Sequence, residues 1–181
     1  MFIRTLGVFQ VIRDGTPVPR TVWQLTKALD LLKILIARRE ATSREQLVEL
    51  LWPEVSLATA GNRLSALLWT LRNVLQPHAS AGPIASNGSV VWLDRYQVDI
   101  DVEIFLTDAH AALAAHRTGQ PDAAKRLMTT FAAYTGDFLE DDAHQDWATP
   151  LAEEVRAIHL SLLQALAAHL RRTGYTDEAT P

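Results

Sequence analysis

The stretch from Gly61 to Pro77, GNRLSALLWTLRNVLQP, constrains the fold of this 181-residue chain more than any other segment. At 100° per residue it predicts a helix with one wholly aliphatic face, about 120° wide. That face carries Leu64, Leu67, Leu68, Leu71, Val74 and Leu75. Because such a face must be buried, we expect this helix to lie at the centre of a helical unit.

The opposite face of the same helix is polar and has no acidic residue. It carries Asn62, Ala66, Trp69 and Asn73, flanked by Ser65 and Thr70, with Arg63 and Arg72 on the shoulders. Asn can read adenine, Arg can read guanine or hold phosphate, and Ser and Thr contact phosphate. This face can therefore dock on DNA, although any solvated helix shows similar residues. Trp69 is open to two interpretations, packing on another part of the protein or contact with the DNA backbone.

The segments around this helix give its context. Residues 4–19 alternate loosely around Asp14-Gly15, which predicts a β-hairpin. Residues 26–40 have apolar side chains at helical spacing, and a second helix opens with a capping box at Ser43-x-x-Gln46 and stops before Pro53. Residues 82–94 form two extended runs around Asn87-Gly88, a tight-hairpin signal.

The order of strands, three helices and a hairpin predicts a winged helix-turn-helix over residues 1–98. In that fold the third helix enters the major groove, and the hairpin wing flanks it on the backbone or the minor groove. The fold class that we expect for the whole chain is mainly α with small β.

Residues 99–181 differ in composition: they predict alanine- and leucine-rich helices, two of which are separated by a turn at Gly119-Gln120-Pro121. Paired helices joined by short Gly-containing turns predict an α-helical tetratricopeptide-like repeat domain. The final GYTDEA reads as the start of another helix. A half-built repeat would expose its apolar face, so we expect a C-terminally truncated domain from a longer protein.

Charge divides the chain in the same way. Residues 1–98 carry eleven Lys and Arg against seven Asp and Glu, a net +4, whereas residues 99–181 carry six against fourteen, a net −8. Residues 1–98 can bind the phosphates of nucleic acid, whereas the net negative charge of residues 99–181 opposes extensive contact with phosphate. With no cysteine, no apolar run long enough for a membrane span and no signal-peptide pattern, we expect a cytoplasmic protein without membrane partners.

One acidic stretch, GDFLEDDAHQDW, resembles a chemical site. It holds Asp137, Glu140, Asp141, Asp142, His144 and Asp146. Its spacing is not that of a calcium loop, so we interpret it as capping and a solvated loop and expect no metal. The sequence has no Gly-rich phosphate loop, His-Glu-x-x-His or Gly-x-Ser-x-Gly. We therefore expect neither a cofactor nor an enzyme.

Five segments in order resemble the SARP-type bacterial transcriptional activators. They are LGVFQVIRDGTPVP, SREQLVELLWPE, NRLSALLWTLRNVLQP, GDFLEDD and DWATPLAEEVRAIHLSLLQALA. That family joins an OmpR-like winged helix to a bacterial transcriptional activation (BTAD) domain of tetratricopeptide-like helices. The resemblance implies double-stranded DNA as partner, binding to promoter direct repeats as side-by-side protomers, and contact with RNA polymerase.

The resemblance also implies DNA contacts by the third helix, the start of the second helix and the wing. Carried over by position, these are Arg44, Arg63, Ser65, Trp69, Thr70, Arg72 and Asn73, with Asn87 and Ser89 on the wing. OmpR-like recognition helices carry more basic residues than this one, so we expect one unit alone to bind weakly and a homodimer on DNA to bind better.

A second hypothesis stays open at this point. A winged helix that has lost DNA affinity would leave a helical-repeat adaptor for protein interactions. The two hypotheses differ in the electrostatics of the third helix, where two arginines and no acid favour DNA.

Overall fold

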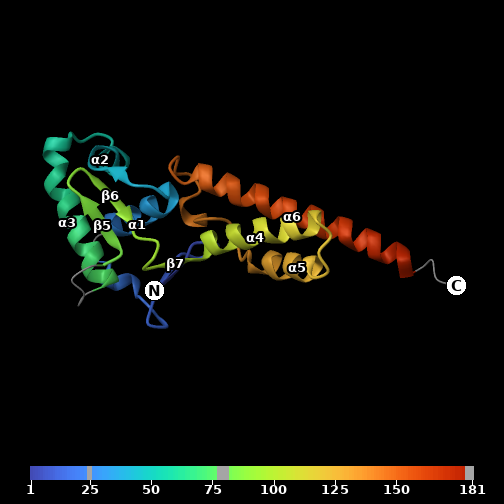
Figure 1. The fold of residues 1–181 in the computed structure, drawn as a ribbon. Helices are drawn as coiled ribbons and strands as arrows, with labels where there is room; N and C mark the ends of the chain where they lie inside the picture. Colours follow the sequence, from blue (N-terminus) through green and yellow to red (C-terminus); the bar gives the residue numbers. More distant parts are fainter. Residues whose placement is uncertain (24–25, 77–81, 178–181) are drawn as a thin grey trace. The chain divides into compact units, whose positions relative to one another are not determined.

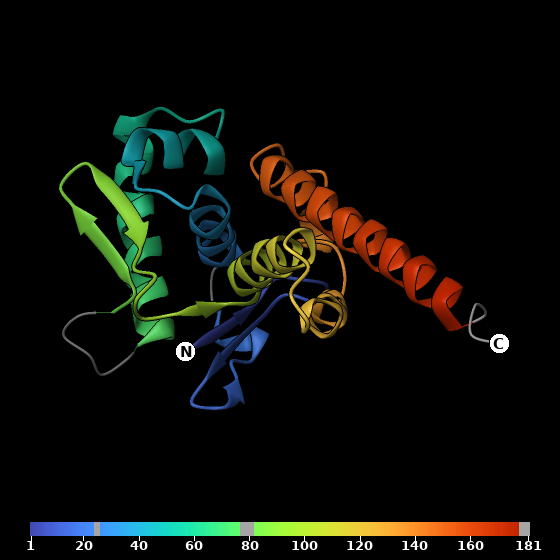
Figure 2. The same ribbon diagram turned by 45° about the vertical axis from the view of Figure 1, so that its right-hand side comes forward.

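The computed structural model describes residues 1–23, 26–76 and 82–177, which form two compact units. Unit 1 comprises Met1–Ile3, Gln10–Asp99 and Gln145–Ala148, and unit 2 comprises Arg4–Phe9, Ile100–His144 and Thr149–Pro181. None of the helices in the described ranges is both long and apolar enough to cross a bilayer. Figures 1 and 2 show the path of the chain through each unit.

The first sheet of the chain has the strand order β3-β2-β1-β7. Its strands are β1 (Phe2–Arg4), β2 (Gln10–Arg13), β3 (Thr16–Pro17) and β7 (Asp99–Ile100). Strands β2 and β3 pair antiparallel across Asp14-Gly15, with φ of 51° and 76°. Two successive positive φ angles are those of a type I′ turn, so the hairpin predicted from Asp14-Gly15 is confirmed.

Unit 1 also contains the predicted three helices, α1 (Thr26–Arg38), α2 (Arg44–Leu51) and α3 (Leu57–Leu75), with a short 3-10 turn, η1 (Arg20–Val22), before them. The capping box is present, because the Ser43 side chain accepts from the Gln46 N–H and the Gln46 side chain accepts from the Ser43 N–H. All six aliphatic residues predicted for the core face of α3 are buried. The helix begins four residues before Gly61, since Leu57–Ala60 continue it after Ser56.

A second sheet, of order β4-β6-β5, closes the helical unit. It contains β4 (Thr42–Ser43), β5 (Ile84–Asn87) and β6 (Val90–Leu93). Asn87 pairs with Val90, so the turn consists of Gly88 and Ser89 instead of the predicted Asn87-Gly88. Of these two residues only Gly88 has a positive φ, 55°, as in a type II′ turn, which favours glycine in the first position. The predicted turn was therefore one residue out of register.

Unit 2 is built around α4 (Asp101–Arg117), α5 (Ala123–Ala133) and α6 (Thr149–Asp177), with η2 (Glu140–Asp142) between the last two. Gly119, with a φ of 67°, lies directly after the C-cap of α4, where the sequence predicted a glycine that ends the helix. The prediction of a new helix at GYTDEA was wrong, because α6 runs without a break from Thr149 to Asp177. Figure 2 shows the end of α6 extending beyond α4 and α5.

A segment from the chain's N-terminus completes unit 2. Asp101, the first residue of α4, accepts four hydrogen bonds through its carboxylate: from Thr5 N (2.7 Å), Thr5 Oγ1 (2.6 Å), Val102 N (2.8 Å) and Leu6 N (3.1 Å). Leu6 is buried and forms a β-bridge with Phe138. Residues Arg4–Phe9 therefore belong to unit 2, although they lie inside the segment predicted to form the N-terminal domain.

Candidate nucleic-acid interface

Arg44 joins the three segments that the sequence assigned to DNA contact. It is the first residue of α2, where its backbone N–H donates to the Ser89 carbonyl (2.8 Å). Its Nε donates to the Gly88 carbonyl (3.2 Å), and its Nη1 donates to Ser65 Oγ on α3 (3.3 Å). The start of α2, the turn of the β5-β6 hairpin (below, the wing) and the middle of α3 thus meet at one side chain.

Arg72 makes a second connection between α3 and the wing. Its Nε donates to the Ile84 carbonyl (3.1 Å), and its Nη2 donates to Ser86 Oγ (2.9 Å). Both acceptors lie on β5, so Arg72 holds the base of the wing while Arg44 holds its turn. A guanidinium has five donors, and each arginine has two engaged in this way, so three remain for another acceptor.

Arg63, Trp69 and Asn73 are among the residues of α3 that point away from the core. All three are exposed, and Trp69 shows 67% of its surface. Within the described part of the chain, Arg63 and Asn73 have no hydrogen-bond or ion-pair partner. An exposed cation, amide and indole on one helix, without an acid, form a surface to which a polyanion can bind.

The other predicted contact residues lie on α3 and at the tip of the wing. Ser65 is exposed, and its hydroxyl donates to the Gly61 carbonyl (3.0 Å) while accepting from Arg44. Thr70 is half-buried on the shoulder of α3. Asn87 ends β5 and Ser89 is the second turn residue, and both are exposed at the tip of the wing. The structure therefore brings Ser65 and Ser89 each into direct contact with Arg44.

Sequence reasoning missed the strand that connects this surface, β4. Thr42 pairs with Val91 and Ser43 pairs with Val90, so the chain forms a ladder with β6 immediately before it enters α2. Thr42 is buried, and β-branched residues favour strands, which is the local signal that was available. This ladder places the start of α2 beside the wing.

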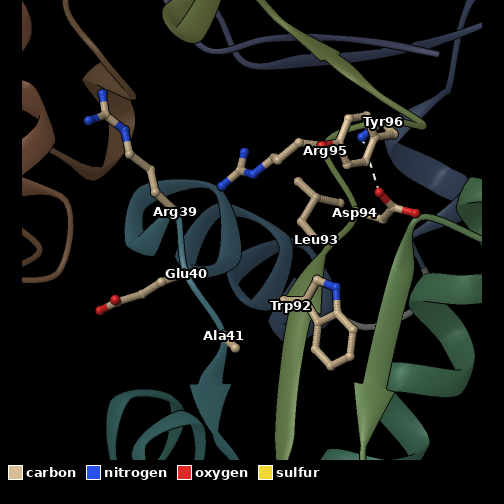
Figure 3. Close-up of a pocket in the computed structure, with 8 residues that line it drawn as sticks. All are labelled: Arg39, Glu40, Ala41, Trp92, Leu93, Asp94, Arg95 and Tyr96. Atoms are coloured by element: carbon tan, nitrogen blue, oxygen red, sulfur yellow. Dashed lines mark hydrogen bonds between the residues drawn. The ribbon is translucent and has the colours of Figure 1, made fainter.

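A depression of about 400 Å³ in unit 1 is lined by residues outside α3 (Figure 3). It is lined by Arg39, Glu40, Ala41 and the run from Trp92 to Tyr96. Much of its polar chemistry is internal: Arg95 Nη2 donates to the Leu35 and Ile36 carbonyls at the end of α1 (3.2 Å each), and Asp94 accepts from the Tyr96 N–H (3.1 Å). Its four charged side chains are two of each sign, so it does not select an ion of one charge.

Unit 2 contains a separate polar cluster at the acidic stretch. Asp137 accepts from Arg156 Nε (3.0 Å) and Nη2 (2.6 Å), and from the Tyr134 hydroxyl. The bonds from Arg156 first, and then that from Tyr134, hold the pKa of Asp137 below its usual value, while burial raises the pKa of Tyr134 to about 12. In the described residues no three His, Asp or Glu side chains are arranged as a metal site. The two bonds from Arg156 to Asp137 hold the loop after α5 to α6.

Comparison with known proteins gives two matches. Residues 100–181 match the model of the bacterial transcriptional activator domain. The fold resembles that of Mycobacterium tuberculosis EmbR in complex with a low affinity phosphopeptide, with a TM-score of 0.78 over 95% of this chain at 22% identity. This chain spans 46% of the EmbR chain. No curated protein sequence gave a significant match.

Both matches agree with the order of elements described above. The domain match covers α4, α5 and α6, and the structural match extends over the winged helix as well. The domain match agrees with the second part of the resemblance inferred from the sequence, since residues 100–181 match the bacterial transcriptional activator domain, and the structural match shows that the chain shares its fold with EmbR.

Proposed function

We propose that this chain is a DNA-binding transcriptional activator that contacts promoter repeats through α3 and the wing. The observation that carries the proposal is the outward face of α3, where Arg63, Trp69 and Asn73 are exposed beside a wing fixed by two arginines. An α-helix of 19 residues is about 28 Å long, which suits insertion in a major groove.

Each exposed residue has a distinct role in this proposal. Arg63 binds phosphate as a point of attachment that carries no sequence information. Asn73 makes a bidentate contact with an adenine edge, and Trp69 packs against the sugar-phosphate backbone. Asn87 and Ser89 at the tip of the wing contact the flanking backbone, and Ser65 and Thr70 add phosphate contacts along α3.

Arg44 and Arg72 act in two ways in this proposal. They hold the wing at a fixed distance from α3 through the Gly88 and Ile84 carbonyls and the Ser65 and Ser86 hydroxyls. Their remaining donors reach phosphates once DNA is bound. Fixing the wing before binding lowers the entropy cost of ordering it on the DNA.

Unit 2 then joins two chains, or contacts RNA polymerase, in the cytoplasm. The net −8 charge of residues 99–181 opposes direct DNA contact, so this part adds DNA affinity by bringing two reader units together. Once one reader unit has bound its repeat, the linked unit is held at a high effective concentration near the second repeat. This gain in DNA affinity compensates for the small number of cations on each α3.

The test is an electrophoretic mobility titration of the full chain on the regulator's own promoter, with DNAs that hold two repeats or one. We expect cooperative binding to two repeats and weak binding to one. Arg63→Ala should weaken binding to both DNAs, and Arg38→Ala, which removes an exposed arginine from the end of α1, is the matched control. No binding by the wild-type chain, or equal losses in the two variants, would contradict the proposal.

The second candidate function is a helical-repeat adaptor whose winged helix does not bind DNA. It is favoured by the low number of cations on α3 and by the exposed leucines of α6, Leu160, Leu163 and Leu170. A folded chain that leaves every promoter fragment unshifted would support this candidate.

A further inference from the structure

Helices α4 and α5 of unit 2 pack against each other and form the two walls of a groove of about 390 Å³. One wall comes from α4 and the other from α5 and its N-cap, and α6 contributes no lining residue. The lining residues are Asp108, Ala111, Ala112, Asp122, Lys125, Arg126, Thr129 and Thr130. Small molecules bind in depressions of roughly 300–1,000 Å³, so the groove is large enough for one.

The hydroxyl of Thr130 opens into this groove without a protein partner. Thr130 is only 5% exposed, and in the part of the chain that the structure describes its side chain makes no hydrogen bond. A helical threonine can donate to the carbonyl four residues back, as Thr107 does to Glu103 (2.8 Å). The Thr130 oxygen is not sealed from solvent, and Thr130 lines the groove. Because an unpaired hydroxyl in a nearly buried residue is costly, the groove has a polar group that a ligand can satisfy.

The charged side chains of the groove leave one charge of each sign unpaired. Arg126 Nε donates to the Asp122 carboxylate (2.7 Å), so these two charges offset each other. Asp108 on α4 and Lys125 on α5 are exposed, and neither has a hydrogen-bond or ion-pair partner among the described residues. The two walls therefore present a free carboxylate and a free ammonium group.

This charge pattern selects against simple ions. An anion bound at Lys125 would be repelled by the carboxylates of Asp108 and Asp122, and a cation bound at Asp108 would be repelled by Lys125 and Arg126. A molecule that carries both charges is attracted by both walls. The axes of packed helices lie about 8–10 Å apart, so side chains from the two walls can hold the two ends of a small zwitterion.

We propose that the groove between α4 and α5 binds a free α-amino acid with an aliphatic side chain. The α-ammonium group donates to Asp108, and the α-carboxylate accepts from Lys125 Nζ and from the Thr130 hydroxyl. Ile104 lies one turn before Asp108 on the same edge of α4 and exposes 44% of its surface, so it and Ala111 provide apolar contact for the ligand side chain. The proposal goes beyond DNA binding and does not depend on it.

The exposure of the two charged groups sets the expected strength. Exposed ion pairs contribute little and are screened by salt, so we expect a dissociation constant in the millimolar range that rises with ionic strength. A ligand that binds only the folded chain also stabilises it. Binding should therefore raise the melting temperature of the full chain.

The first experiment titrates the full chain with L-leucine and follows backbone amide signals by nuclear magnetic resonance at low salt. We expect saturable shifts, and dissociation constants about fivefold higher or more for N-acetyl-L-leucine, which lacks the cation, and for L-leucinamide, which lacks the carboxylate. L-glutamate and L-lysine should also bind more weakly, because each brings a third charge without a fixed partner. Absence of saturable shifts with L-leucine, or equal binding of the two blocked analogues, would overturn the proposal.

The second experiment removes the two charges of the site. Asp108→Asn and Lys125→Met should each raise the dissociation constant for L-leucine about fivefold or more. Arg117→Met is the matched control, since Arg117 is an exposed cation at the end of α4 that does not line the groove. Circular dichroism verifies that each variant is folded. Wild-type affinity in either charge variant, or an equal loss in the control, would overturn the proposal.

The third experiment separates ligand binding from packing at Thr130. Thr130→Val exchanges the unpaired hydroxyl for a methyl group, so the ligand-free variant should melt at the wild-type temperature or above it. L-leucine should then bind more weakly and raise the melting temperature less than it does in the wild type. A lower melting temperature together with wild-type affinity would overturn the proposal, because the hydroxyl would then serve the fold. None of the three experiments contains DNA, so their failure would leave the DNA-binding function of α3 to be judged by its own titration.

Discussion

Helices α3 and α6 bury similar lines of leucine but present different outer faces. The outward face of α3 offers Arg63, Trp69 and Asn73, whereas that of α6 offers exposed leucines flanked by charges of both signs. The buried faces determine how each unit folds, and they do not reveal what each unit binds. The outer faces make that distinction, since one suits a polyanion and the other suits an apolar partner.

The two units also differ in what their polar side chains stabilise. In unit 1, Arg44 and Arg72 hold a wing that lies at the surface. In unit 2, Asp101 holds the N-terminal segment through hydrogen bonds to Thr5, which is fully buried, and Leu6. Loss of a polar contact should therefore affect mainly DNA binding in the first unit and mainly folding in the second.

The largest effect is expected for Asp101→Ala. This change leaves the N–H and hydroxyl of Thr5 and the N–H of Leu6 without their acceptor, and buried donors without a partner are costly. We expect the free energy of unfolding to fall by about 3 kcal/mol, measured by urea denaturation. Asp108→Ala, at an exposed position on the same helix, should change it by less than about 0.5 kcal/mol. Similar losses in the two variants would show that the N-terminal segment does not stabilise unit 2.

The next effect in size concerns specificity in unit 1. If Asn73 reads a base edge, Asn73→Ala should weaken binding to the best site by about 1–3 kcal/mol and leave non-specific binding nearly unchanged. Titration of the best site and of an unrelated duplex at one salt concentration separates the two effects. A uniform loss across sequences would reassign Asn73 to a backbone contact.

Arg63 and Arg72 should differ although both are arginines of α3. Arg63→Ala should lower the slope of log K against log salt by about one unit and leave stability unchanged. Arg72→Ala should lower the slope in the same way and also reduce the free energy of unfolding by about 1 kcal/mol, since it frees the Ile84 carbonyl and the Ser86 hydroxyl. Salt titrations and urea denaturation of both variants test this difference, and identical behaviour in stability would remove the wing-holding role of Arg72.

The smallest effect is a pH dependence of unit 2. His159 stacks on Tyr134 and Phe131, and burial lowers its pKa below the usual 6.5 although Asp137 opposes the shift. Because the unfolded chain then binds a proton that the folded chain does not, stability should fall as the pH drops below about 6.5. We expect a loss of about 1 kcal/mol or less by pH 5.5, and a smaller one in His159→Phe. Urea denaturation at pH 7.5 and 5.5 measures both, and equal losses would exclude His159 as the titrating group.

The sequence by itself determined the elements that depend on neighbours along the chain. The capping box at Ser43 and Gln46, the Asp14-Gly15 turn and the buried face of α3 all follow from spacings of one to four residues. The same spacings identified the outward face of α3, so the exposed positions of Trp69 and Asn73 were predictable, with Arg63 on the shoulder of that face.

Tertiary structure alone decided the partners that lie far apart in the sequence. Asp101 meets Thr5 across 96 residues, and Arg44 meets Gly88 across 44. The turn of the wing moved by one residue because pairing of β5 with β6 set the register, and local turn preference did not. No local pattern encodes such contacts, since their free energy comes from packing and ladder formation once the whole unit has assembled.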